Sequence, residues 1–149
     1  MNQIVRDKPL QSNCWISIHD KRMTSIVCND ESILLYFADG FTLIEDDQIV
    51  AIPKGYIELS DCSPDNFNCI IIKRRKSKKG ARLYGKSISL VELGKMLAKK
   101  RKSVEIYLEQ YDFNLMHWRG EFFPCKKRGL ADCIVIEAMD FFTMTYHWD

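Results

Sequence analysis

The sequence predicts a β-rich α+β domain, in which a curved antiparallel sheet or partial barrel packs against one main helix near residues 90–101. Two observations lead to this prediction. Only one stretch has apolar residues at helical spacing, whereas many short stretches between turn-forming residues have the apolar patterns of strands. A chain of 149 residues also suits one domain with its own core, so we expect a single domain over residues 1–149.

The helix is the best-defined element. Ser89 is followed three residues later by Glu92, which is the spacing of a capping box and predicts a helix start. Leucines then recur on one face of the expected helix, at Leu90, Leu93 and Leu97. The last turn is cationic, which suits the negative end of the helix dipole and predicts an end near Arg101.

Strands are expected on both sides of the helix. Before it they cover 14–18, 23–28, 33–37, 41–44, 48–52, 56–59 and 69–72, and after the basic turn 81–88. After the helix, strands are expected at 104–108, 113–123, 133–138 and 141–148. Asp39-Gly40 predicts a tight hairpin, because glycine supplies the positive φ of such turns, and strand 41–44 is therefore expected to pair with strand 33–37.

The two strands expected after the helix and at the chain end carry further predictions. Glu105 and Glu109 alternate with apolar residues, so we expect both carboxylates on the face turned away from the core, where they keep the strand soluble. In the last strand, at least three of four alternate residues are expected in the core: Phe142, Met144, Tyr146 and Trp148. This strand is also a candidate sheet edge.

Charge is unevenly distributed, although the whole chain carries only +2. Residues 1–70 hold 5 basic and 11 acidic groups, a net charge of −6, and residues 71–149 hold 17 and 9, a net charge of +8. The acidic half offers a surface for a cationic protein partner. Its candidate contact residues are Asp30, Glu31, Asp39, Glu45, Asp46, Asp47, Asp61 and Asp65.

The basic residues gather in one span. Between 73 and 102 there are thirteen Lys and Arg and a single acidic residue, Glu92. Such a span can neutralise nucleic-acid phosphates, and Tyr84 and Tyr107 can add base stacking if they share its face. The candidate residues are Lys73, Arg74, Arg75, Lys76, Lys78, Lys79, Arg82 and Lys86. The alternative interpretation is a hairpin tip whose lysines prevent edge-to-edge pairing.

Catalytic and metal-binding patterns are not found in the sequence. There is no Cys-x-x-Cys, and the three histidines (His19, His117 and His147) are scattered, so we expect no metal or cofactor. No Gly-x-Ser-x-Gly or phosphate-binding glycine loop occurs either. We expect no catalytic residues; the only candidates for an enzyme site are His117, Glu105, Glu109 and Asp132.

The chain is expected to be cytoplasmic. The first eleven residues carry Arg6, Asp7 and Lys8 and lack the apolar core of a signal peptide. The longest apolar runs, such as residues 33–38, are too short to cross a membrane, so no membrane association is expected. Six irregularly spaced cysteines in a chain of this size are expected to be reduced and mostly buried.

In size and strand-rich layout, and in Trp118-Arg119-Gly120 and the ending Tyr146-His147-Trp148, the chain resembles the small cytosolic immunity proteins of bacterial polymorphic toxin systems, including contact-dependent inhibition. The resemblance implies a protein that binds and blocks a cognate toxin domain, and it transfers no site residues. The leading hypothesis is therefore a non-enzymatic, immunity-type inhibitor with a charged docking surface. The alternative is a nucleic-acid-binding domain that uses residues 73–102.

Overall fold

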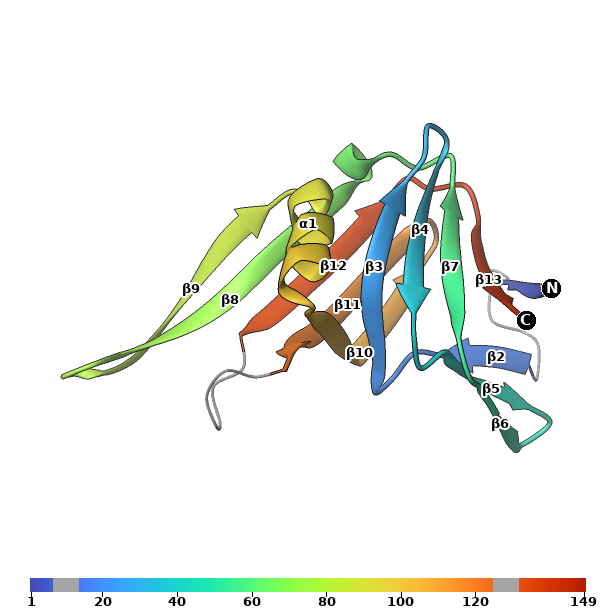
Figure 1. Cartoon of the computed structure of the whole chain (residues 1–149), viewed down its shortest axis with the longest axis horizontal. Coiled ribbons are helices and arrows are strands. Elements are labelled where there is room, and N and C mark those ends of the chain that lie inside the picture. The colour runs from blue at the N-terminus through green and yellow to red at the C-terminus, as the bar shows by residue number, and fades with distance from the viewer. Residues whose placement is uncertain (7–13, 125–131) are drawn as a thin grey trace.

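The computed structural model describes residues 1–6, 14–124 and 132–149, and within them the chain is a β-rich α+β domain (Figure 1). Ten antiparallel strands form a large curved sheet that does not close into a barrel. Their spatial order is β1 (Asn2–Val5), β13 (Met144–Trp148), β7 (Gly55–Ser60), β4 (Ser32–Phe37), β3 (Lys21–Cys28), β10 (Ser103–Asp112), β11 (Leu115–Phe123), β12 (Cys133–Met139), β8 (Phe67–Ser77) and β9 (Gly80–Ile88). A second sheet has the order β2 (Cys14–Ser17), β5 (Phe41–Glu45) and β6 (Gln48–Ile52). The predicted fold class is confirmed.

The helix α1 (Leu90–Lys100) begins where the capping box predicts. The Ser89 hydroxyl accepts from the Glu92 N–H at 3.1 Å, and the Glu92 carboxylate accepts from the Ser89 N–H at 2.8 Å. At the other end Arg101 adopts a left-handed conformation with φ 47°, which stops the helix. The three leucines of the predicted apolar face are at most 2% exposed.

The helix packs against β3 and β8, which lie on either side of β10, β11 and β12 in the sheet order. It therefore spans the core-facing side of the curved sheet, as Figure 1 shows. Gly94 lies over Ile26 of β3, where an added Cβ would be 3.6 Å from the isoleucine Cβ, so the helix approaches this strand closely. A short 3-10 helix, η1 (Pro64–Asn66), joins β7 to β8 and also contacts α1.

The Asp39-Gly40 turn joins the two sheets, so the predicted hairpin is wrong. Strand β5 pairs with β2 and β6, and β4 pairs with β3 and β7. Gly40 does adopt a positive φ of 63°, and an added Cβ would lie 1.8 Å from the carbonyl oxygen of Ile52. Glycine is therefore required at position 40, because the backbone there lies too close to the Ile52 backbone to leave room for a side chain. At this turn the chain leaves the large sheet and enters the second sheet.

A β-bulge in β10 reverses the face on which the side chains lie. The register with β11 shifts between Ile106 and Leu108, so Tyr107 is the extra residue. Before the bulge Glu105 lies on the outer face; beyond it Glu109 pairs with Trp118, which is fully buried in the core. The prediction that Glu105 and Glu109 share a face is therefore wrong, because alternation along a strand cannot reveal an inserted residue.

The C-terminal strand is shorter and more central than predicted. It begins at Met144, and Phe142 is 72% exposed in the preceding turn. Met144 and Tyr146 are buried and Trp148 is half-buried against the core, so three of the four residues pack in or against the core, and Phe142 is the exception. Strand β13 pairs with β1 on one side and with β7 on the other, so the prediction that it is a candidate sheet edge is wrong.

Replacing Ser89 by alanine should lower the free energy of unfolding by about 1 kcal/mol, because the first turn of α1 loses its side-chain acceptor. Urea denaturation checks this value. The matched control is Ser87→Ala, at an exposed position of β9, which should change stability by about 0.5 kcal/mol or less. Equal losses in the two variants would contradict a stabilising cap.

Candidate binding surfaces

The eight predicted acidic contact residues are all exposed, but they do not form one surface. Four lie at one end of the molecule, in the β3–β4 turn and in the segment after β7. A hydrogen bond joins these two segments: the Cys62 N–H donates to the Glu31 carbonyl at 3.4 Å. These four are Asp30, Glu31, Asp61 and Asp65. The other four lie near the second sheet, at the other end in Figure 1. They are Asp39 in the β4–β5 link and Glu45, Asp46 and Asp47 around the β5–β6 turn.

The second sheet exposes an apolar row. Trp15, Ile44 and Ile49 are directly opposite one another across β2, β5 and β6, and therefore share one face. Trp15 is 42% exposed and Ile49 75% exposed, while Ile44 is half-buried. The residues on the other face of this sheet enter the core, among them Ile16, Phe41 and Ile52.

Carboxylates border this row. Asp46 and Asp47 both have positive φ, 47° and 64°, which is the geometry of a two-residue type I′ turn closed by Glu45 opposite Gln48. One residue separates the turn from Ile44 and one separates it from Ile49, so the carboxylates of Asp46 and Asp47 lie beside the row where β5 meets β6. The Glu45 side chain lies on the opposite face of β5 from Ile44. We call Trp15, Ile44, Ile49, Asp46 and Asp47 the docking face.

The composition of the docking face, an apolar centre that includes tryptophan and a charged border, is typical of protein interfaces. The sequence predicts its acidic members but not its apolar ones. The sequence does carry a signal for Ile49, because residues 49–52 are all apolar, whereas a strand with one buried face needs apolar residues only at alternate positions. In the structure only Ile52 of these four is buried. For Trp15 no signal distinguishes exposure from burial.

The basic hairpin of β8 and β9 projects from the rest of the domain (Figure 1). Pairing places Lys73 opposite Tyr84 and Lys86 opposite Ile71, on the face that continues the core side of the sheet. Arg82 follows on the same face of β9, so cationic side chains flank a tyrosine there. Lys76, Lys78, Lys79, Arg82 and Lys86 are exposed, and Lys73 is half-buried. The side chains of Arg74 and Arg75 lie outside the described residues.

A polar cluster is buried where β1, β2, β10 and β13 meet. Arg6 donates to the Tyr146 hydroxyl from Nε at 2.9 Å and from Nη2 at 2.8 Å, and its guanidinium lies 3.7 Å from the centre of the Tyr111 ring. The Glu109 carboxylate accepts from the Ile18 N–H at 2.7 Å. Burial raises the pKa of Glu109, and the Ile18 N–H and Arg6 oppose that shift. These contacts tie together four strands, so we assign the cluster a structural role.

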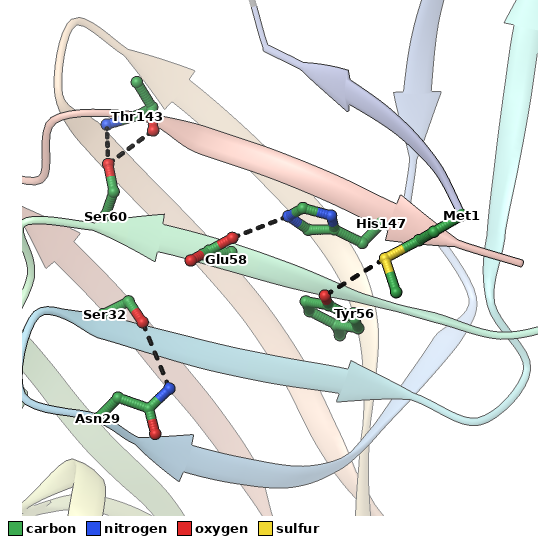
Figure 2. A network of polar contacts seen from close by, with 8 residues as sticks. All are labelled: Met1, Asn29, Ser32, Tyr56, Glu58, Ser60, Thr143 and His147. Atoms are coloured by element: carbon green, nitrogen blue, oxygen red, sulfur yellow. Dashed lines mark hydrogen bonds and ion pairs between the residues drawn. The ribbon is translucent and has the colours of Figure 1, made fainter.

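Histidine–glutamate pairs lie on the outer face of the large sheet. His147 Nε2 is 2.9 Å from Glu58 Oε2, as Figure 2 shows, and its ring stacks on Tyr56 with centroids 4.6 Å apart. This stacking explains why the outer side of β13 is also buried. On β11, His117 Nδ1 is 2.7 Å from Glu137 Oε1.

The candidate enzyme residues are not brought together. Glu109 faces the core, whereas Glu105 and His117 lie on the outer face, where Glu105 is paired with Arg22 at 3.2 Å and His117 with its glutamate. Asp132 begins the segment that enters β12, and its carbonyl accepts from the Phe122 N–H at 3.0 Å. Residues from opposite sides of a packed sheet cannot act on one substrate.

Cysteines, metal ligands and membrane segments give no further site among the residues described. Cys62 and Cys69 are buried thiols, and burial raises the pKa of Cys62 to about 11 and that of Cys69 to about 12. Cys28 is exposed, and Cys125 lies outside the described residues. Within the described part of the chain no three metal-ligating side chains converge, and no helix there has the length and apolar character to cross a bilayer.

No protein-family model, curated protein or solved structure matches this chain. Its function is therefore argued from its own surfaces.

Replacing Glu109 by glutamine should stabilise the protein more at pH 7 than at pH 4. Because the pKa of Glu109 is raised in the folded state, the folded chain holds the proton more tightly than the unfolded chain, and stability is lost as pH rises through the range between the two pKa values. The glutamine variant lacks this loss. Urea denaturation of both proteins at the two pH values measures the difference.

The control for this experiment is Glu105→Gln, which alters a half-exposed surface ion pair and should change stability by about 0.5 kcal/mol or less. A Glu109→Gln variant whose relative stability falls as pH rises would contradict the assigned direction.

Proposed function

We propose that the chain is a non-enzymatic protein-binding module, and specifically an immunity-type inhibitor that acts in the cytoplasm by covering the active site of a cationic toxin domain. The observation that carries the proposal is the docking face, an apolar row of Trp15, Ile44 and Ile49 bordered by the carboxylates of Asp46 and Asp47. Exposed apolar patches rimmed by polar or charged residues mark interaction sites.

The charge of the docking face selects the class of partner. Enzymes that cleave nucleic acid bind phosphates with lysine and arginine, so their active sites are cationic. An acidic surface is attracted to such a site, which accelerates association and repels acidic proteins. The apolar row then supplies the desolvated contact area from which most binding free energy comes.

Replacing Ile49 by aspartate or Trp15 by alanine should weaken the complex with the toxin domain by about 30-fold or more, because each removes a central apolar contact. The partner to test is a toxin-type domain encoded by a gene beside the gene for this chain, and calorimetry measures the affinity. The matched control is Phe142→Asp, since Phe142 is 72% exposed and Ile49 75% exposed, but Phe142 lies outside the docking face. Its affinity should stay within about twofold of the wild type.

The charge of the turn is tested separately by the double change Asp46→Asn and Asp47→Asn, which keeps residues that tolerate a left-handed conformation. The association rate should fall by about tenfold at low salt, with a smaller fall at high salt. If no neighbouring toxin domain binds or is inhibited, or if Ile49→Asp binds as the wild type does, the proposal is wrong.

The basic hairpin supports a second candidate function, nucleic-acid binding. Lys73, Arg82 and Lys86 flank Tyr84 on one face of a hairpin that projects beyond the core (Figure 1). Cations at strand spacing can follow a phosphate backbone while the tyrosine ring stacks on a base.

For this second function, binding of a 20-nucleotide single strand should depend steeply on salt. The triple change Lys73→Gln, Arg82→Gln and Lys86→Gln should reduce the slope of log K against log salt by about 2, because each phosphate contact contributes about 0.7. Fluorescence anisotropy at several salt concentrations gives the slope. Lys54→Gln, at an exposed lysine near the second sheet, is the control and should leave the slope unchanged. Absence of binding at low salt would exclude this function.

A further inference from the structure

We infer that the partner adds an extended, cationic segment as a fourth strand to the free edge of β6, and this inference rests on the proposed function. Strand β6 is the last strand of the second sheet and pairs only with β5. Its first four residues are all exposed, so nothing in the described part of the chain covers this edge. An open edge offers backbone donors and acceptors to an incoming strand.

The register identifies which backbone groups are free. Gln48 closes the type I′ turn opposite Glu45, and the closing pair of such a hairpin is hydrogen-bonded. Bonded and non-bonded pairs alternate along an antiparallel ladder, so Val50 and Ile52 bond to β5 while Ile49 and Ala51 do not. The N–H and C=O groups of Ile49 and Ala51 therefore point away from β5, toward an added strand.

The edge of β6 also lacks the features that normally prevent pairing. Its residues, Gln48 to Ile52, include no charge and no proline, and the β5–β6 register contains no bulge. The edges of the large sheet differ from it. Strand β9 carries Arg82 and Lys86 on its edge, and β1 at the other edge has only four residues. Of these edges, β6 is the one open to pairing.

The side chains around the edge define the added segment. On the outer face an incoming strand would lie beside Ile49, which is 75% exposed, and on the opposite face beside Val50, which is 48% exposed. Both favour β-branched or other apolar side chains. At the turn, the segment would pass Glu45, Asp46 and Asp47, which favour lysine or arginine. A second copy of this chain fits less well, because it would bring three more carboxylates into the same interface.

The probe is a synthetic octapeptide with blocked termini that alternates lysine and valine. Its binding should protect the Ile49 and Ala51 amides from hydrogen exchange and leave Val50, which already bonds to β5, nearly unchanged. An octapeptide alternating glutamate and valine should bind at least about tenfold more weakly, because it meets like charges. NMR of the wild-type protein measures both effects and needs no substitution.

A pair of variants tests the backbone contact. Ala51→Pro removes an outward N–H without removing a bond to β5, and should weaken peptide binding by about tenfold, whereas Ala51→Val keeps the N–H and should bind within about twofold of the wild type. The inference would be overturned if peptide binding left the Ile49 and Ala51 amides unprotected from hydrogen exchange, or if the two peptides bound equally well. It would also be overturned if, without peptide, these amides became protected as the protein concentration rose. A toxin complex lost in Ile49→Asp but unaffected in Ala51→Pro would overturn strand addition and leave the proposed function standing.

Discussion

The burial of one helix against two distant strands is the contact on which this architecture depends. Helix α1 places Leu90, Leu93 and Leu97 in the core between β3 and β8, which three other strands separate in the sheet. A sheet of ten strands twists, and its core-facing side needs cover over its whole width. The helix covers the middle of that side. The second sheet covers the remaining end, where Phe41 lies 5.5 Å from the Tyr146 ring and 5.6 Å from the Phe37 ring, measured between centroids.

This division of the core explains why the docking face exists. The second sheet is only three strands wide, and it uses one face to complete the core. Its other face has no helix or sheet in the described structure to cover it, and the apolar row of Trp15, Ile44 and Ile49 is therefore left in contact with solvent. The Gly40 turn, which allows the chain to pass close to the Ile52 carbonyl, is the local feature that makes the second sheet possible.

Local features of the sequence predicted local structure well. The Ser89–Glu92 capping box, the leucine face of α1 and the β8–β9 hairpin depend on residues close in the chain, and each is found. Features set by distant contacts were not predicted. Alternation shows which face of a strand is buried but not which strand is its neighbour, so β5 was assigned to β4 and the bulge at Tyr107 was missed. The candidate acidic residues are exposed, but only the fold divides them into two groups.

The edge of β6 and the carboxylates beside it act together. An uncharged, apolar edge strand normally carries a risk of aggregation, because identical chains can pair through it. Here Glu45, Asp46 and Asp47 lie at the turn that begins β6, so two copies that pair through this edge place the carboxylates of both in one interface with no cation to offset them. The same carboxylates attract a cationic chain. One group of charges thus opposes self-association and favours a partner of opposite charge, which is how a protein can keep a sheet edge open for binding.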